Sequence, residues 1–167
     1  MINKWNFQTP SEEELHKRDR LASQLGLSPV VCLLLVQRGL TTVEEVKKFF
    51  KPSLNDLHDP FLMPDMEKAV KRLNKALGNK EKILIYGDYD VDGTTAVSLV
   101  YKYLRPYSSA LDYYIPDRYD EGYGISYKGI NYARENGITL VISLDCGIKA
   151  IEKIEHAKQL GIDFIIC

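Results

Sequence analysis

The feature that most constrains the fold is an alternation of short apolar runs and helical segments that begins near residue 81. Three of the four apolar runs are apolar on both faces, which is typical of strands buried inside a parallel sheet. The expected strands lie at 83–86, 111–115, 139–144 and 163–166. The expected helices between them lie at 94–104, 126–136 and 148–160. We therefore predict an α/β fold, with a parallel sheet of at least four strands and helices on both faces.

A helical region is expected before this sheet. A Ser or Thr followed three residues later by Glu marks helix starts at Ser11 and at Thr42. An amphipathic helix is expected at 65–77, and its basic face is either solvated or in contact with nucleic acid. Residues 52–64 have no hydrophobic period and are rich in proline near their end, so we expect a connecting loop there.

Charge is divided unevenly between the two domains that this pattern predicts, 1–80 and 81–167. The first carries 13 Lys and Arg against 10 Asp and Glu, and the second carries 9 against 13. The whole chain of 167 residues is 45% hydrophobic and has a net charge of −1, so it has no overall basic signature of nucleic-acid binding. The acidic excess therefore lies in the α/β domain.

Cysteine usage and hydropathy indicate the compartment. Cys32, Cys146 and Cys167 are an odd number without paired spacing, which predicts free thiols in a reducing compartment and hence a cytoplasmic location. The longest apolar run, Val30 to Val36, is far shorter than the roughly 20 residues of a membrane-spanning helix. No membrane partner is expected.

The loop after the first expected strand carries Asp88, Asp90 and Asp92 at alternate positions. Two carboxylates ~4 Å apart repel by roughly 4 kcal/mol at an effective dielectric near 20, so a cation would stabilise the cluster. The pattern resembles the start of an EF-hand calcium loop, but Leu99 stands where the bidentate Glu belongs, and a strand precedes the loop. Oxygen ligands alone favour Mg²⁺ or Mn²⁺. The alternative is that one Asp caps the next helix and the others are solvated.

A second carboxylate position follows the third expected strand. In a parallel sheet, Asp145 lies at the same edge as Asp90 and Asp92. Asp145 alone is most simply interpreted as a helix cap. Because two strand ends deliver carboxylates to one crevice, we interpret the set as one metal site. Cys146 has no nearby His and no C-x-x-C pattern, so we interpret it as structural.

The loop at 116–124 follows the second expected strand. Arg118 has the planar guanidinium that suits phosphate, and Tyr119 and Tyr123 offer faces on which a base could stack. The alternative is a polar surface loop without a ligand. The candidate substrate-binding residues are Arg118, Tyr123 and Gly124.

Four motifs together carry a family resemblance. They are Tyr86-Gly-Asp-Tyr-Asp-Val-Asp-Gly93, Ile115-Pro-Asp-Arg118, Glu121-Gly-Tyr-Gly124 and Leu144-Asp-Cys-Gly-Ile148. This set resembles the RecJ type of single-stranded-DNA-specific exonuclease, in the Asp-His-His (DHH) phosphoesterase superfamily. The segments 33–40 and 59–66 resemble the N-terminal region of the same family.

The resemblance implies a two-metal phosphoesterase that uses Mn²⁺ or Mg²⁺. It would remove 5′-mononucleotides from single-stranded DNA, 5′ to 3′, in recombination and repair, and other proteins of those processes would be possible partners. Asp90 and Asp92 match the family's first metal motif, with Asp88 as a further participant, and Asp145 matches the second. Two cations would polarise the scissile phosphate and lower the pKa of a bridging water. The loop 116–124 would hold the DNA strand.

The sequence departs from the family at its end. It stops at Cys167, where the family places its Asp-His-His signature immediately afterwards. We therefore expect an N-terminal fragment of a longer enzyme, with an incomplete DHH-type domain that is inactive alone and weak in metal affinity. The last strand, 163–166, is expected to be either an exposed edge strand or an interior strand that lacks its neighbours, so self-association is a risk.

Two other functions remain open. Related enzymes of the same superfamily act on pyrophosphate or short oligonucleotides, although the long N-terminal helical region and the loop 116–124 argue against such a substrate here. A non-enzymatic binding domain would use the acidic loop as a metal or partner site. Turnover that depends on both Asp90 and Asp145 would separate an enzyme from such a domain.

Overall fold

The part of the chain that this computed structural model describes, residues 9–167, divides into two units between Asp59 and Pro60. The division differs from the expected boundary between residues 80 and 81. Its physical reason is helix α4 (Met66–Gly78), whose apolar face packs against the sheet through Leu73, Ala76 and Leu77. The helix therefore belongs with the α/β unit.

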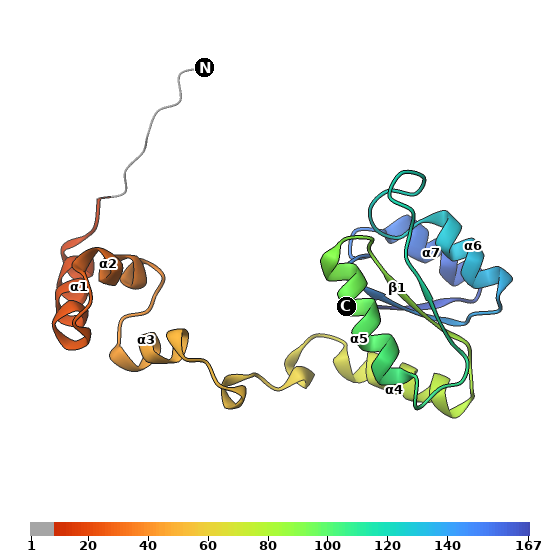
Figure 1. The fold of residues 1–167 in the computed structure, drawn as a ribbon, viewed down its shortest axis with the longest axis horizontal. Coiled ribbons are helices and arrows are strands. Elements are labelled where there is room, and N and C mark those ends of the chain that lie inside the picture. The colour runs from red at the N-terminus through yellow and green to blue at the C-terminus, as the bar shows by residue number, and fades with distance from the viewer. Residues whose placement is uncertain (1–8) are drawn as a thin grey trace, which may run out of the picture. The chain divides into compact units, whose positions relative to one another are not determined.

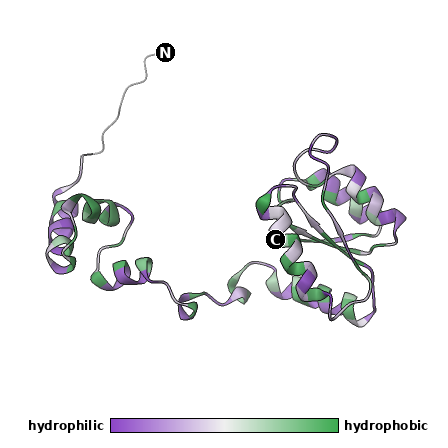
Figure 2. Ribbon diagram, viewed as in Figure 1, coloured by the Kyte–Doolittle hydropathy of each residue, from purple (hydrophilic) through white to green (hydrophobic). Residues whose placement is uncertain are grey.

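Three helices form the first unit: α1 (Glu12–Leu25), α2 (Pro29–Gln37) and α3 (Val43–Phe50). Both predicted capping boxes are present, at Ser11 and at Thr42, and each hydroxyl accepts the N–H of the Glu three residues on. The core residues of this unit are Leu21, Cys32, Leu35, Val36 and Val46. Because α2 is hydrophobic all round (Figure 2), it also leaves Val30, Val31 and Leu34 at the surface.

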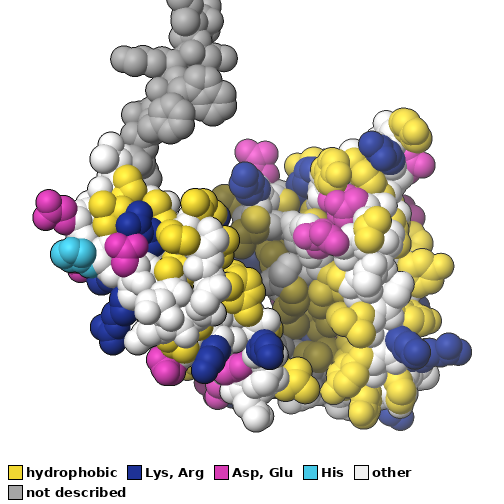
Figure 3. All heavy atoms as spheres, turned by 60° about the vertical axis from the view of Figure 1, so that its left-hand side comes forward, with side chains coloured by type: hydrophobic (Ala, Val, Ile, Leu, Met, Phe, Trp, Pro, Cys, Tyr) yellow, Lys and Arg dark blue, Asp and Glu magenta, His cyan; other side chains and the backbone are white. Residues whose placement is uncertain are grey.

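Two short 3₁₀ helices, η1 (Leu54–Asp56) and η2 (Pro60–Leu62), interrupt the stretch before α4. Asp65, the first residue of the helix predicted at 65–77, occupies the N-cap position of α4. Its side chain makes no capping hydrogen bond, because its backbone is left-handed, with φ of 59°. Hydrophobic side chains reach the surface in both units (Figure 3).

The second unit contains a four-stranded parallel sheet, and the predicted fold class is confirmed (Figure 1). Its strands are β1 (Ile83–Gly87), β2 (Leu111–Tyr114), β3 (Leu140–Leu144) and β4 (Asp163–Ile166), in the order β2-β1-β3-β4. The connecting helices are α5 (Val91–Leu104), α6 (Tyr127–Glu135) and α7 (Ile151–Gln159). β1 and β3 are buried along their whole length, which explains their apolar sequences.

Each face of the sheet has its own hydrophobic core. On the face covered by α4 and α5, the buried residues are Ala76, Ile83, Ile85, Val97, Leu104, Leu140, Ile142 and Leu144. On the face covered by α6 and α7, they are Leu84, Tyr86, Ile125, Ile130, Ala133, Ile138, Val141, Ala157 and Ile162. The predicted arrangement of helices on both faces is confirmed.

The strand order reverses between β1 and β3. The chain leaves β1 for β2 on one side and continues from β3 to β4 on the other, while β1 and β3 pair directly, with Gly87 opposite Leu144. In parallel α/β sheets, ligands bind beyond the carboxyl ends of the strands at such a reversal. Asp88 and Asp145 each follow one of these two paired residues.

The opposite edge of the sheet is held by ion pairs. The Arg72 guanidinium lies 2.7 Å from a carboxylate oxygen of Glu81 and 2.5 Å from one of Asp163, and Thr139 donates its hydroxyl to Glu81 at 2.7 Å. Two basic residues of the helix predicted at 65–77 are thus paired within the protein, Arg72 here and Lys71 with Glu67. The contacts of Arg72 and Glu81 join α4 to the amino ends of β1, β3 and β4.

The three cysteines, Cys32, Cys146 and Cys167, are all free thiols, as predicted. Within residues 9–167, no helix is long and apolar enough to cross a bilayer.

Candidate active site

Asp88 is a buried carboxylate, only 3% exposed, at the carboxyl end of β1. Its Oδ1 accepts the N–H of Tyr89 at 2.7 Å. Its Oδ2 accepts the N–H of Gly124 at 3.1 Å, from the loop that follows β2. Both oxygens thus have protein donors, and the side chain ties two loops of the same sheet edge together.

Asp90 is the N-cap of α5, and its Oδ1 accepts the N–H of Gly93 at 3.0 Å. The predicted start of this helix, at Thr94, is wrong by three residues because this cap begins the helix at Val91. The alternative in which one Asp caps the helix and the others are solvated is confirmed for the cap, Asp90, and is wrong for Asp88, which is buried. The cap uses one oxygen of the carboxylate. Asp92 lies in the first turn of α5, where its side chain is exposed.

The loop between Asp88 and α5 is packed too closely to admit any side chain at Gly93. A Cβ placed there would lie 2.5 Å from the backbone nitrogen of Asp88 and would also overlap its carbonyl. The backbone of the helix start therefore contacts the backbone of the strand end directly, which fixes the Asp88 and Asp90 side chains relative to each other.

Asp145 projects from the carboxyl end of β3 with a left-handed backbone, φ of 59°, and is exposed. It is not a helix cap, and the predicted helix start at 148 is wrong. A turn in which Ala150 donates its N–H to the Gly147 carbonyl at 2.9 Å delays α7 until Ile151. Asp145 therefore caps no helix and lies in the turn between β3 and α7.

The pKa of Asp145 is raised above its ordinary value. The side chain is exposed as a whole, but loss of water on its protein side contributes most, followed by repulsion from Asp90, Asp92 and Asp88 in that order. The sequence prediction that these carboxylates share one edge of the sheet agrees with this repulsion. Carboxylates that follow β1 therefore act on the carboxylate that follows the neighbouring strand β3.

Proximity of the charges does not make a complete metal site. Among residues 9–167, no group of three or more His, Cys, Asp and Glu side chains is arranged to hold a metal ion. Coordination requires oxygens about 2.0–2.6 Å from the ion, whereas repulsion between carboxylates acts over several ångströms more. The carboxylate oxygens are of the kind that a hard divalent cation prefers, but the described side chains do not form a site for one.

Cys146 lies beside this edge without the character of a nucleophile. Burial raises the pKa of its thiol to about 12, and the charges of Asp88 and Asp145 add to the effect. A thiol with that pKa is protonated at neutral pH, and only the thiolate attacks. The interpretation of Cys146 as structural agrees with this environment.

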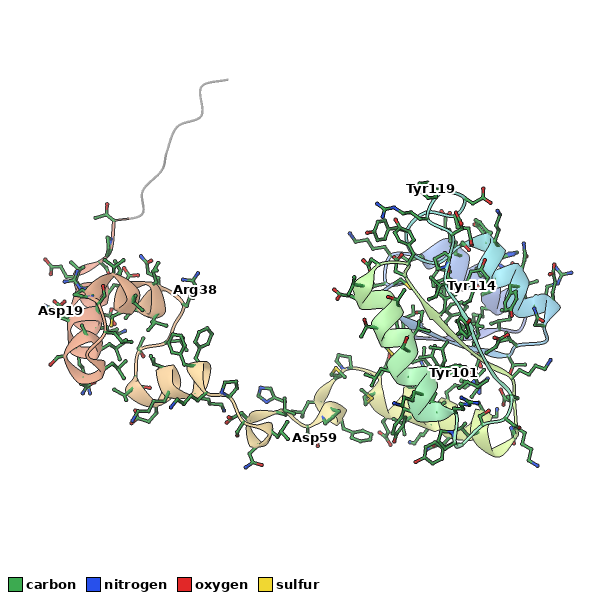
Figure 4. The ribbon with its side chains drawn as sticks, viewed as in Figure 1. Asp19, Arg38, Asp59, Tyr101, Tyr114 and Tyr119 are labelled. Atoms are coloured by element: carbon green, nitrogen blue, oxygen red, sulfur yellow. The ribbon has the colours of Figure 1, made fainter. Side chains whose placement is uncertain are left out.

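The loop between β2 and α6 rises from the same edge of the sheet (Figure 1). Its Arg118 guanidinium lies 5.4 Å from the centre of the Tyr89 ring, and the Tyr123 ring lies 4.6 Å from that ring. The candidates Arg118 and Tyr123 therefore meet beside the residue that separates Asp88 from Asp90. Tyr119 is 95% exposed at the tip of the loop (Figure 4) and has no part in this group.

Sequence reasoning missed the polar network at the base of this loop. The hydroxyl of Tyr86 donates to the Gly124 carbonyl at 3.0 Å and accepts the N–H of Ser126 at 3.1 Å. Tyr114 donates its hydroxyl to Glu121. The available signal was a tyrosine in each of two neighbouring strands, since a buried tyrosine hydroxyl requires a hydrogen-bond partner.

Comparison with known proteins gives a consistent family. The model of the DHH family, N-terminal domain, matches residues 82–167. The single-stranded-DNA-specific exonuclease RecJ of Bacillus subtilis (strain 168) is 40% identical over 163 residues, which are 98% of this chain and 20% of that protein. The exonuclease of the same name from Escherichia coli (strain K12) is 32% identical over 142 residues, covering 84% of this chain and 24% of that protein.

Two solved structures share the fold. A crystal structure of exonuclease RecJ bound to manganese aligns with a TM-score of 0.57 and 28% identity, over 63% of this chain and 28% of that chain. RecJ in complex with Mn²⁺ from Thermus thermophilus aligns with a TM-score of 0.65 and 22% identity, over 91% of this chain and 20% of that chain. The chain thus spans about a fifth to a quarter of the curated relatives named above.

Proposed function

We propose that this chain, which belongs to the DHH family, forms part of a metal-dependent exonuclease that hydrolyses phosphodiester bonds of single-stranded DNA. The observation that carries the proposal is that β1 and β3, paired at the reversal of strand order, are followed directly by the loops that carry Asp88, Asp90, Asp92 and Asp145. Repulsion from the first three adds to the desolvation that raises the pKa of Asp145. Such a concentration of carboxylates destabilises the folded chain unless a cation balances it. Similarity to proteins named as exonucleases supports the choice of reaction.

Asp90, Asp92 and Asp145 are the side chains that would contribute oxygens to Mn²⁺ or Mg²⁺. Asp88 would contribute less directly, because both of its oxygens already accept backbone N–H groups. The bound cation would supply Lewis-acid activation of the scissile phosphate and of water. Since three or more such side chains do not reach coordination geometry within residues 9–167, the proposal includes ligands from elsewhere in a longer protein.

The loop between β2 and α6 would hold the DNA strand. Arg118 lies against the Tyr89 ring, and in a stacked guanidinium the N–H groups at the rim remain available to a phosphate. Tyr123, whose ring contacts that of Tyr89, would present its exposed face to a base. The Gly124 N–H would hold Asp88 in place beneath them.

The activity is assigned to a longer protein, because the chain spans only about a fifth of relatives that carry the exonuclease name. We place that protein in DNA recombination and repair, with 5′ to 3′ digestion and with other proteins of those processes as partners. The chain alone would have weak metal affinity and no turnover.

The test measures release of nucleotides from labelled single-stranded DNA by a protein of the relatives' length that contains this chain. Asp145→Asn should lower the rate roughly a hundredfold or more, since even partners of metal ligands are worth 10- to 100-fold. Asp65→Asn is the matched control, because Asp65 has the same φ of 59° and is exposed far along the sequence from the site. Its rate should equal that of the wild type.

Parallel assays separate the alternatives. Preference for pyrophosphate or a dinucleotide over long single-stranded DNA would replace the exonuclease assignment with another phosphoesterase activity. Metal-dependent turnover that survives both Asp90→Ala and Asp145→Ala, with the variants folded, would contradict the site itself.

A further inference from the structure

Glu121 is the centre of the network that closes the loop between β2 and α6. Its Oε1 accepts the N–H of Asp117 at 2.8 Å, near the start of the loop. Its Oε2 accepts the hydroxyl of Ser126, where the loop ends and α6 begins. The hydroxyl of Tyr114, in β2, lies 3.0 and 2.9 Å from the two oxygens. One carboxylate thus joins the strand end and both ends of the loop.

The donors around Glu121 are all uncharged. No Lys or Arg forms an ion pair with it in the described part of the chain. It is half-buried, whereas the neighbouring Asp120 is exposed and pairs with Lys128 at 2.7 Å. The N–H of Asp117 and the hydroxyls of Ser126 and Tyr114 all need an acceptor atom. The two oxygens of Glu121 accept all three, so this position requires a side chain with two acceptor oxygens.

The network continues from Glu121 to the acidic edge. Ser126, which donates to Glu121, gives its own N–H to the Tyr86 hydroxyl at 3.1 Å, and Tyr86 donates to the Gly124 carbonyl at 3.0 Å. The N–H of Gly124 in turn donates a hydrogen bond to Oδ2 of Asp88 at 3.1 Å. Gly124 is therefore held on both sides of its backbone, with its carbonyl toward the network and its N–H toward the carboxylate.

We propose that Glu121 is a positioning residue, which closes the loop at its base and thereby fixes the Gly124 N–H on Asp88 and Arg118 beside Tyr89. The inference rests on the proposed function and deepens it. It names the residue that fixes the positions of the Asp88 carboxylate and of the Arg118 guanidinium proposed to bind phosphate. Glu121 itself contacts neither a reacting atom nor the candidate ligands Asp90, Asp92 and Asp145.

The first test is amide hydrogen exchange in the full chain, compared between wild type, Glu121→Ala and Glu121→Gln. The Gly124 amide should exchange at least about tenfold faster in the alanine variant, while the strand amides of Leu84 and Val141 stay within about twofold. The glutamine variant should fall between, because its amide retains one acceptor oxygen. Asp120→Asn removes a neighbouring exposed carboxylate and should leave the exchange of Gly124 unchanged.

A purely structural role gives a different result. If loss of Glu121 only weakened the fold, the exchange of Gly124, Leu84 and Val141 would rise together, and the proposal would be overturned. Unchanged exchange of Gly124 in Glu121→Ala would overturn it as well.

The second test titrates the chain with Mn²⁺ and follows paramagnetic broadening of the amides at 88–93. Glu121→Ala should require up to about tenfold more Mn²⁺ for the same broadening, because without Glu121 the Gly124 N–H that donates to Asp88 is no longer held in place. Equal titrations of wild type and Glu121→Ala, with the titration of Asp145→Asn weakened, would overturn the positioning role and leave the proposed function intact. Absence of broadening near Asp90 in the wild type would contradict the proposed function, and the exchange of Gly124 would then decide the positioning role alone.

Discussion

Replacing Tyr86 by Phe removes a single oxygen atom from the interior of the sheet unit. The residue is 1% exposed, and burial raises the pKa of its hydroxyl to about 12, so that the group is a neutral donor at pH 7. The hydroxyl donates to the Gly124 carbonyl at 3.0 Å and accepts the Ser126 N–H at 3.1 Å. The ring itself, stacked 5.4 Å from that of Tyr114, would remain.

The magnitude follows from the groups left behind. A net loss of about 1 kcal/mol is expected for the donated hydrogen bond. The Ser126 N–H, in a residue that is 5% exposed, would lose its partner, which adds about 1–2 kcal/mol. The expected loss in the free energy of unfolding is therefore about 2–3 kcal/mol.

Hydrogen exchange of the β1 and β3 amides measures this loss in the sheet unit alone. Because 1.4 kcal/mol corresponds to a factor of ten, the most protected amides should exchange about 30- to 150-fold faster in Tyr86→Phe. Tyr113→Phe is the control, since that side chain is 57% exposed and should change exchange by less than about twofold. Equal protection in the wild type and Tyr86→Phe would refute the reasoning that the buried network stabilises this edge.

Three further predictions concern charge and packing. Because the pKa of Asp145 is raised in the folded chain, its ionised form lowers the stability of the fold at pH values above its ordinary pKa of 3.8. Without metal, Asp145→Asn should therefore raise the melting temperature at pH 7. The gain should vanish as the pH falls below 3.8. Gly93→Ala should lower the free energy of unfolding by about 2–3 kcal/mol in urea titrations because its Cβ would overlap backbone, whereas Gly78→Ala, with nothing within 4 Å, should raise it by about 1 kcal/mol. Arg72→Leu should lower the free energy of unfolding by about 1–2 kcal/mol at pH 7. Hydrogen bonds from Thr139 and Arg72 lower the pKa of Glu81 below its ordinary value of 4.5. Calorimetry should therefore show that the loss becomes smaller as the pH falls below 4.5 and Glu81 is protonated.

The sheet could be predicted because its central strands carry an unambiguous pattern. β1 and β3 are buried at every position, and a run of apolar residues between helical segments has few other interpretations. The strand order could not be predicted, since it depends on which helix crosses which face. The place of α4 in the α/β unit was also missed, because an amphipathic helix has the same sequence pattern whichever core it covers.

The candidate site could be predicted in part for a similar reason. Carboxylates directly after two neighbouring strands must share an edge of a parallel sheet. The repulsion that adds to desolvation in raising the pKa of Asp145 agrees with this expectation. The helix starts were less accurate: Asp90 begins α5 early, and the Gly147 turn begins α7 late. The role of Glu121 depends on contacts with Tyr114 and Ser126, which no local pattern encodes.

The central claim is that Asp90, Asp92 and Asp145 contribute to one divalent-cation site. The most direct measurement is Mn²⁺-induced broadening of backbone amide signals in the isotope-labelled chain, which localises even weak binding. Broadening should begin at 88–93 and 145–147, spare the amides of Lys82 and Thr139 at the opposite edge of the sheet, and weaken in Asp145→Asn. Broadening that begins elsewhere, or that is unaffected by Asp145→Asn, would contradict the account.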